Sequence, residues 1–461
     1  MRSWSRWGWR GEAALAREIA GAVEGAVAGK DVSVSRVAVD SHEVTGGDLF
    51  VALRGERVDG HDFVDGAFAA GAAAALVDRP VARPHVLVAD TEDALRRLAV
   101  DERTAMSATV IGITGSTGKT SVKDLTAAIL GMRFRVSASP RSFNTEVGVP
   151  VTLLNADPEA DVVVCEMGSR GLGHIRSLTE VARPVVGVVT NVGLAHLEMF
   201  GSPENVANAK AELVEALPAA GTAVLNADDP VVRSFAERTA ARVVLFGTEE
   251  GTDVRGEDLR LDETGRPSFT LRTADGAERV DLPVAGEHMA WNALAAAGAG
   301  VALGLTAGEC AAGLKEARIS GWRMEIVEAS AGYRIVNDAY NANPTSMAAA
   351  LKAAAWMARD GRSIAVLGHM AELGPIADRE HERVGELAAR LGIDRLVVVG
   401  PEARRIAVGA IREGVEPDRV TEVASVEEAA SAVREAVRPG DVVLLKGSRV
   451  AGLERVAEAI A

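Results

Sequence analysis

The chain is 461 residues long, which suggests about three domains at roughly 150 residues each. Apolar residues make up 48% of it and charged residues 25%, a composition that is ordinary for a folded protein and excludes disorder for most of the chain. Its 50 basic and 65 acidic residues leave a net charge of −15. A surface this acidic argues against non-specific binding to nucleic acid or to an anionic membrane. It still allows an anionic small molecule, because one local basic site is enough.

The two cysteines, Cys165 and Cys310, have no CxxC partners. A disulfide framework or a zinc site is therefore not expected, and a reducing compartment, the cytoplasm, is. Arginines and tryptophans alternate over the first residues, and acidic residues bracket the weak apolar stretch that follows, so we expect no signal peptide. The uncharged run 290–308 is mostly Ala and Gly, which favours a buried helix over a membrane span.

Three α/β regions are predicted in chain order. The first, residues 1–107, holds short β-like runs and one helical stretch, at 62–72. The second, residues 108–320, carries apolar strands without alternation, separated by helices such as 203–217, which predicts a parallel sheet covered on both faces. Its segment 251–283 is charged and alternating, and we interpret it as an antiparallel hairpin insertion.

The third region, residues 321–461, repeats the strand and helix alternation. Five strand candidates end in the segments NDAY, LGHM, VVVG, EVAS and LKGS, and helices at 375–391 and 426–437 lie between some of them. This pattern predicts a second doubly wound, Rossmann-like domain.

A glycine-rich loop follows the first strand of the second region and opens a helix. Gly115 and Gly118 let backbone N–H groups converge on phosphate oxygens, and the helix N-terminus adds the positive end of its dipole. Lys119 can neutralise the β- and γ-phosphates, and the Thr120 hydroxyl can bind Mg²⁺. The general pattern requires glycine at the position of Ile113, so only the shorter T-G-x-x-G-K-T form fits. The predicted ATP-binding loop comprises Thr114, Gly115, Ser116, Thr117, Gly118, Lys119, Thr120 and Ser121.

Three later side chains add chemistry. Glu166 ends a predicted strand, where its carboxylate can face a metal ion on the phosphates, and His196 comes just after the next strand. Both strands should end at the sheet edge that carries the loop, because ligands bind there in open α/β sheets. Lys210 lies in a predicted helix, and on propensity alone it is a solvated lysine.

Taken together, these segments resemble the Mur ligases of peptidoglycan synthesis over nearly the whole chain. TGSTGKTSVKD is similar to the ATP loop of the family, TNVGLAHLEMFGSPENVANAKAEL to its histidine and lysine segment, and GEHMAWNALAA to its adenine-side helix. Within the family the similarity is to the branch that adds D-alanyl-D-alanine, with NDAYNANPTSM as its most specific segment. The DNPR segment of the diaminopimelate-adding branch is absent.

The resemblance implies a role for each matching residue. Thr120 and Glu166 would hold Mg²⁺ at the ATP phosphates, and His196 with a carbamylated Lys210 would hold a second Mg²⁺. These residues and Lys119 would be the catalytic set. The implied nucleotide contacts outside the loop are His288, Asn292, Arg323, Asp338, Tyr340 and Asn341, and the implied contacts of the UDP-linked substrate are Ser41, His42, Asn144, Thr145 and Arg170. The sequence departs from the family at His42, His174 and His369, which stand where Arg, Glu, and Asp or Glu are frequent, and the start with Trp4, Trp7 and Trp9 has no counterpart.

The implied architecture is a small UDP-binding domain, a central P-loop ATPase domain and a C-terminal Rossmann-like domain. The implied activity is ATP-dependent ligation of D-alanyl-D-alanine to UDP-N-acetylmuramoyl-tripeptide through an acyl phosphate, in a chain that we expect to be monomeric. Two alternatives stay open: a sister ligase for another amino acid, such as a folylpolyglutamate synthetase, and a P-loop NTPase that regulates a partner without ligation. The third residue of the tripeptide, diaminopimelate or lysine, is also open.

Overall fold

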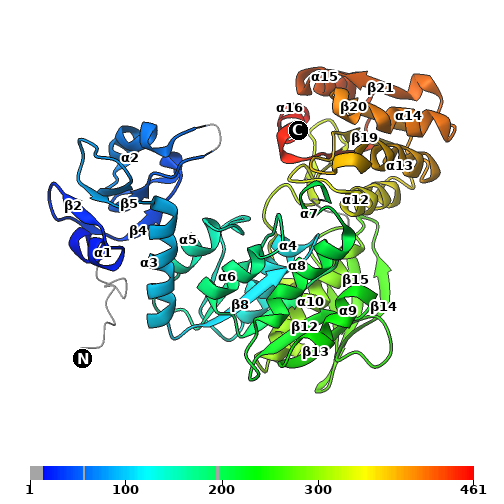
Figure 1. The fold of residues 1–461 in the computed structure, drawn as a ribbon. Helices are drawn as coiled ribbons and strands as arrows, with labels where there is room; N and C mark the ends of the chain where they lie inside the picture. Colours follow the sequence, from blue (N-terminus) through cyan, green and yellow to red (C-terminus); the bar gives the residue numbers. More distant parts are fainter. Residues whose placement is uncertain (1–13, 56–57, 194–196) are drawn as a thin grey trace.

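The computed structural model describes residues 14–55, 58–193 and 197–461, and it arranges them as three α/β units along the chain (Figure 1). The predictions for Trp4, Trp7, Trp9 and His196 therefore lie outside the described residues. Among the described helices, none combines the length and the apolar character that crossing a membrane requires.

The N-terminal unit is built on a five-stranded sheet in the order β2-β7-β6-β5-β4, in which only β2 runs antiparallel to its neighbour. A short antiparallel pair, β1 with β3, lies beside it. The elements are β1 (Ala14–Leu15), α1 (Ala16–Ala22), β2 (Ala26–Ala28), β3 (Ser33–Val34), β4 (Arg36–Ala38), β5 (Asp48–Val51), α2 (Val64–Ala70), β6 (Ala74–Val77), β7 (His85–Leu87) and α3 (Thr91–Ala105).

The middle unit forms a nine-stranded sheet in the order β16-β15-β14-β13-β12-β11-β8-β10-β9, parallel from β9 to β14. Its strands are β8 (Thr109–Thr114), β9 (Val136–Ala138), β10 (Val162–Glu166), β11 (Val186–Val189), β12 (Thr222–Asn226), β13 (Arg242–Gly247), β14 (Val254–Leu261), β15 (Pro267–Thr273) and β16 (Gly276–Asp281). Its helices are α4 (Lys119–Leu130), α5 (Gly148–Leu154), α6 (His174–Ala182), α7 (Leu197–Phe200), α8 (Pro203–Glu215), α9 (Pro230–Ser234), α10 (His288–Ala302) and α11 (Ala307–Lys315).

The segment 251–283, predicted as an antiparallel hairpin insertion, is antiparallel but forms three strands, β14, β15 and β16, and it is not a separate insertion. Its first strand, β14, pairs in parallel with β13 through Phe246 with Val254 and Gly247 with Arg255, so the segment extends the central sheet. The sequence could not show this join, because pairing between strands is not encoded in the alternation of either strand.

Apolar strands without alternation arise here because both faces of the parallel sheet are buried. On β10, Val163 and Cys165 pack on the face covered by α5, α6 and α8, while Val162 and Val164 pack with α4, α10 and α11. Neighbouring residues on a strand point to opposite faces, so each face receives every second side chain. The uncharged run at 290–308 is the buried helix α10, as predicted.

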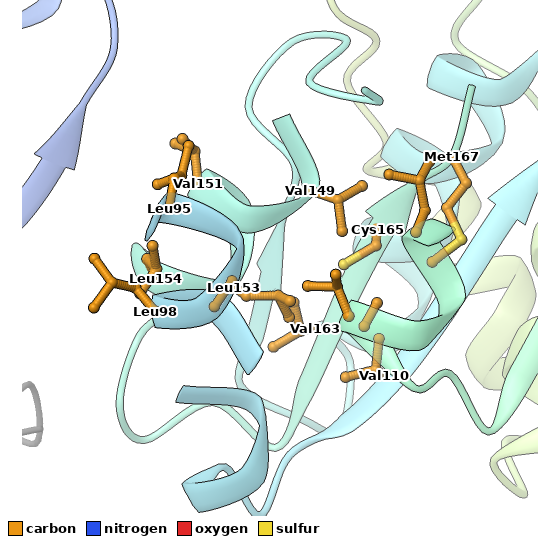
Figure 2. Packing of buried hydrophobic residues seen from close by; sticks show 14 of the residues in the cluster. Leu95, Leu98, Val110, Val149, Val151, Leu153, Leu154, Val163, Cys165 and Met167 are labelled. Atoms are coloured by element: carbon orange, nitrogen blue, oxygen red, sulfur yellow. The ribbon is translucent and has the colours of Figure 1, made fainter. Parts of the chain in front are cut away.

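The N-terminal and middle units share one apolar core. Leu95 and Leu98 of α3 lie against Val151 and Leu154 of α5, and the same cluster continues to Val163 of the central sheet (Figure 2). Two hydrogen bonds join the units further: the side-chain amide of Asn155 accepts from the backbone N–H of Val37 and donates to its carbonyl. Helix α3 therefore docks the first unit on the second.

The C-terminal unit is a six-stranded sheet in the order β17-β18-β22-β19-β20-β21, parallel except for the edge strand β17, which the sequence analysis missed. Separate apolar clusters cover its two faces, which makes it doubly wound as predicted. Its elements are β17 (Glu325–Glu328), β18 (Arg334–Asn337), α12 (Pro344–Met357), β19 (Ser363–Leu367), α13 (Ala377–Arg390), β20 (Arg395–Val399), α14 (Arg404–Arg412), β21 (Val420–Val423), α15 (Val426–Ala436), β22 (Val442–Lys446) and α16 (Glu454–Ile460).

Candidate active site

A cleft of about 1000 Å³ separates the carboxyl edge of the central sheet from the C-terminal unit. The predicted site residues that line it are Ser116, Thr117, Gly118, Lys119, Thr120, Ser121, Asn144, Thr145, Glu166, Arg170, Lys210, His288, Asn292, Arg323, Asp338, Tyr340 and Asn341. Segments of the sequence that lie more than 200 residues apart thus face one space. Of the predicted residues that the structure describes, four are outside its lining: Ser41, His42, Thr114 and Gly115.

The glycine-rich loop takes its shape from the ends of β8 and β11. Gly115 has φ +144°, and a Cβ there would lie 1.9 Å from the Thr190 hydroxyl oxygen. That hydroxyl donates a hydrogen bond to the carbonyl of Thr117 at 2.6 Å. Gly118 has φ +80°, and a Cβ would lie 2.4 Å from Oδ1 of Asn292. Both positions require glycine, for the backbone angle and for the space.

Lys119 begins α4, and its Nζ donates to the carbonyl of Gly115 at 2.8 Å. Burial lowers the pKa of this lysine, an effect that the Glu166 carboxylate opposes and the Arg323 guanidinium reinforces. Desolvation disfavours the charged amine. An anion in the cleft would compensate that loss, which is the behaviour expected of a phosphate-binding lysine.

Two side chains, those of Glu166 and Arg323, converge on the hydroxyl of Thr120. This hydroxyl donates to Oε2 of Glu166 at 2.7 Å and accepts from Nη2 of Arg323 at 2.7 Å. The second oxygen of Glu166 accepts from the amide of Asn144, also at 2.7 Å. The Arg323 guanidinium lies over the Tyr340 ring, 4.1 Å from its centroid, which fixes its plane.

This arrangement fits a magnesium ion held partly by a nucleotide. A hydroxyl and a carboxylate, the two hard oxygen donors named by the sequence, stand 2.7 Å apart at the cleft. The described residues contain no group of three or more His, Cys, Asp or Glu side chains that could hold a metal ion by themselves. Mg²⁺ sites of this kind use one or two carboxylates and take further oxygens from substrate phosphates and water.

Lys210 is buried, with 2% of its surface exposed, so its interpretation as a solvated helix lysine is wrong. Its Nζ lies 2.7 Å from the Ser169 hydroxyl and 6.0 Å from the centroid of the Phe200 ring. Burial, with the nearby Lys119 charge, lowers the pKa of Lys210 well below its ordinary value. The Glu212 carboxylate opposes this lowering of the pKa only in part, and its two oxygens accept the backbone N–H groups of Gly173 and Arg176 at the start of α6.

Helix α10 presents His288 and Asn292, the predicted adenine contacts, to the cleft. Burial lowers the pKa of His288, which favours the neutral imidazole. The sequence analysis missed Trp291, which also lines the cleft and donates from Nε1 to Oδ2 of Asp228 at 2.7 Å. Trp291 lies between His288 and Asn292 on the same helix, and this position in the sequence could have indicated that it also faces the nucleotide site.

The C-terminal wall is organised by Lys446, a second residue that the prediction missed. Its Nζ lies 2.6 Å from Oδ2 of Asp338 and donates to the carbonyl of Asn341 at 2.9 Å, and only 2% of the lysine side chain is exposed. Lys446 ends β22 and Asp338 follows β18, and these strands are parallel neighbours. The segment LLKGS held the signal, a lone lysine at the end of a buried strand.

The residues expected to contact the UDP-linked substrate lie in two separate places. Asn144, Thr145 and Arg170 line the cleft, whereas Ser41 and His42 lie on a short 3₁₀ helix, Ser41–Glu43, of the N-terminal unit. Residues 40 and 42 pair with each other through the imidazole at 3.0 Å, and the His42 side chain is largely exposed.

Comparison with known proteins agrees with this geometry. Three models match consecutive parts of the chain: "Mur ligase family, catalytic domain" over residues 33–110, "Mur ligase middle domain" over 113–300, and "Mur ligase, glutamate ligase domain" over 322–449. A Mycobacterium tuberculosis (strain ATCC 25618 / H37Rv) protein named UDP-N-acetylmuramoyl-tripeptide--D-alanyl-D-alanine ligase is 43% identical, with 96% of each chain covered. The chain therefore belongs to the Mur ligase family.

Solved structures narrow the similarity to one branch of that family. A crystal structure of MurF from Acinetobacter baumannii matches with a TM-score of 0.85 and 30% identity, covering 97% of this chain and 99% of that one. The MurF ligase of Thermotoga maritima in complex with ADP matches with a TM-score of 0.78 and 32% identity, covering 92% of this chain and 96% of that one. The predicted resemblance to the D-alanyl-D-alanine-adding branch is confirmed.

Proposed function

We propose that this Mur ligase joins D-alanyl-D-alanine to UDP-N-acetylmuramoyl-tripeptide with conversion of ATP to ADP and phosphate. The observation that carries the proposal is the convergence on Thr120: a phosphate-loop hydroxyl, the Glu166 carboxylate and an arginine of the interdomain linker meet within 2.7 Å contacts at one point. A nucleotide bound by the loop would have its terminal phosphate there. The named relatives supply the identity of the two substrates.

A carboxylate does not acylate an amine at a useful rate, so it must be activated first. In the first step a tripeptide carboxylate oxygen attacks the γ-phosphorus of ATP, and the bond between this phosphorus and the β–γ bridging oxygen breaks. The products are ADP and an acyl phosphate. In the second step the amine of D-alanyl-D-alanine attacks the acyl carbon, the C–O bond breaks, and phosphate and one proton are released. No protein nucleophile takes part, so the cleft needs no Ser–His or Cys–His pair.

The residues of the chain contribute position and charge to these steps. Lys119 and Arg323 bring two cations to the phosphoryl group, where charge is redistributed as the phosphorus–oxygen bonds exchange. Asn144 holds Glu166, and the C-terminal wall encloses the reaction, which limits hydrolysis of the acyl phosphate. Thr120 and Glu166 would hold one Mg²⁺, and bound Mg²⁺ supplies further neutralisation of phosphate charge.

We also propose that Lys210 carries a carbamate when the enzyme is active. Carbamates form from a neutral amine, and burial favours that form of Lys210. The neutral amine adds CO₂ and releases a proton, which gives the buried side chain a carbamate with one negative charge shared by two oxygens. These oxygens, with His196, would hold a second Mg²⁺.

Lys210→Ala is expected to be nearly inactive, and short carboxylic acids in the buffer should restore part of the activity by filling the space of the lost carbamate. A second readout is independent of activity: after incubation with ¹³C-bicarbonate, wild type should show a carbamate carbon signal that Lys210→Ala lacks. A fully active Lys210→Ala enzyme, or wild type without that signal, would refute the carbamate.

Further parts of the proposal rest on the same resemblance. Ser41, His42, Asn144, Thr145 and Arg170 contact the UDP-linked substrate, the domains span 1–107, 108–320 and 321–461, and the enzyme acts as a monomer in the cytoplasm. Both cysteines are free and buried, which suits a reducing compartment.

The test is mass spectrometry of the product formed from ATP, D-alanyl-D-alanine and each UDP-tripeptide, with diaminopimelate or lysine as third residue. We expect the UDP-pentapeptide, and the better tripeptide identifies the natural third residue. Phosphate release should require both substrates. Release from ATP alone, without product, would favour a regulatory NTPase, and product only with another amino acid would favour a sister ligase.

A further inference from the structure

The first turn of α4 carries the phosphate-binding residues, and the next turn carries a buried ion pair that the reaction chemistry does not use. Lys123 and Asp124 lie 2.9 Å apart, and their side chains are 3% and 13% exposed. Burying two charges is costly unless every hydrogen-bonding group is satisfied.

Lys123 holds the loop that carries Ser142 and Asn144. Its ammonium has three N–H donors, and it has three partners: the carbonyls of Ser139 and Arg141, each at 2.8 Å, and Asp124. Arg141 has φ +48°, a left-handed backbone that a non-glycine residue seldom adopts, and its own carbonyl is one of those acceptors. The lysine thus stabilises a turn that would otherwise relax.

Asp124 holds the segment that joins the middle and C-terminal units. Its Oδ2 accepts both the backbone N–H and the hydroxyl of Ser320, each at 2.8 Å. Three residues further on, Arg323 reaches back to Thr120. Trp322 and Met324, on either side of Arg323, both have positive φ, at 60° and 52°. A linker with this backbone needs an anchor to present its arginine in one position.

The two anchored segments meet at the reacting phosphate. Arg323 donates to the hydroxyl of Ser142 at 3.4 Å as well as to Thr120. The loop held by Lys123 also places Asn144 on Glu166. One buried pair therefore joins the helix that binds ATP to both segments that complete the site around its terminal phosphate.

We propose that Lys123 and Asp124 are a positioning pair that sets the arrangement of Arg323, Ser142 and Asn144 around Thr120 and Glu166. Neither residue lines the cleft. Its loss should slow phosphoryl transfer, because groups displaced by about 1 Å can cost roughly 100-fold in rate. ATP affinity should change little, since Lys119 and the loop backbone remain in place. The inference rests on the proposed ligase activity.

The experiment measures kcat and the KM for ATP by UDP-pentapeptide formation, with urea unfolding of each variant. For Lys123→Met we expect a fall in kcat of about 10- to 100-fold and a KM for ATP within about threefold of wild type. Lys352→Met, which removes an exposed lysine of α12, is the matched control and should behave as wild type.

Asp124→Ala and Ser320→Ala form a double-mutant cycle that does not depend on the stability of Lys123→Met. Ser320→Ala removes one hydroxyl from a half-buried linker residue, and we expect kcat to fall about three- to tenfold. The double variant should be no slower than Asp124→Ala alone. Multiplying effects, an unchanged kcat in folded variants, or a loss confined to the KM for ATP would overturn the positioning role. Wild type that forms no pentapeptide would instead refute the proposed function.

Discussion

Both walls of the cleft place a lysine and a carboxylate beyond the ends of neighbouring parallel strands, yet the two pairs are used differently. In the middle unit, Glu166 at the end of β10 contacts a hydroxyl and an amide, and Lys119 after β8 makes no ion pair with any described residue. In the C-terminal unit, Lys446 and Asp338 contact each other at 2.6 Å.

The difference follows from how each lysine is satisfied. Lys119 bonds one carbonyl of its own loop, so its charge remains free for an anion in the cleft. Lys446 is neutralised by Asp338 and bonds the carbonyl of Asn341 as well, so it fixes the wall and has little left to offer a ligand. The same topology therefore supplies a binding group on one side and a scaffold on the other.

The largest effect is expected on the binding side. Lys119→Ala should lower the ligation rate by about 100- to 1000-fold or more, because the charge that develops on the phosphoryl oxygens is no longer neutralised. The free energy of unfolding should hardly change, since the side chain stands at the sheet edge. Steady-state ligation and urea unfolding measure the two quantities, with Lys315→Ala, an exposed lysine outside the cleft lining, as control. A folded Lys119→Ala enzyme with near-normal turnover would remove the phosphate-loop assignment.

The scaffold side should lose stability as well as activity. Lys446→Met leaves the Asp338 carboxylate without its buried partner, and breaking such a pair costs about 3–5 kcal/mol. Urea unfolding should show this loss in the C-terminal unit. Adding Asp338→Asn to Lys446→Met should recover part of the stability, because no uncompensated charge remains. If Lys446→Met unfolds like wild type, the contrast between the two walls does not hold.

A milder effect is expected where α10 meets the loop. Asn292 is buried against Gly118, and its amide donates to the Met289 sulfur at 3.3 Å. Asn292→Ala should raise the KM for ATP and leave kcat less affected, because adenine contacts bind substrate and transition state about equally. Initial rates over a range of ATP concentrations separate the two constants. A variant that loses kcat alone, with ATP affinity intact, would exclude an adenine contact.

The smallest expected effect is a pH dependence of stability that arises from His381 in the C-terminal unit. His381 accepts the N–H of Met370 at its Nε2, 2.9 Å away, and burial lowers the pKa of this imidazole below its ordinary 6.5. The unfolded chain then binds a proton more readily than the folded one below pH 6.5, so the free energy of unfolding should fall as the pH decreases through that region. Urea unfolding at about pH 7.5 and about pH 5.5 should show a smaller decrease for His381→Gln than for wild type. Equal decreases would mean that His381 is not the titrating group.

Sequence reasoning located the binding side better than the scaffold. The residues from Ser116 to Ser121 are consecutive, follow a strand and open a helix, so their spacing alone predicted an anion site, and in the structure all six line the cleft. Lys446 and Asp338 are 108 residues apart, and no spacing relates them. Their contact exists because β18 and β22 are paired, with Asn337 opposite Leu445.

Lys210 shows the same limit for a single residue. Helical propensity and acidic neighbours predicted a solvated lysine, and only resemblance to a family suggested otherwise. In the folded chain the Glu212 carboxylate accepts hydrogen bonds from backbone N–H groups at the start of α6. The amine of Lys210 lies against the Ser169 hydroxyl, in the segment after β10. Its burial depends on helices α6 and α8 packing together, a contact between separate segments.

The sequence by itself determined the three α/β units, the parallel character of two sheets and the phosphate loop, because these depend on apolar runs, helix and strand periodicity and residues that are neighbours along the chain. Only the tertiary structure decided that the antiparallel strands at 254–281 extend the central sheet, that Lys210 and Lys446 are buried, and that Arg323 meets Thr120. Those outcomes depend on which strands pair and which helices cover them, and these are contacts between distant segments that local patterns do not specify.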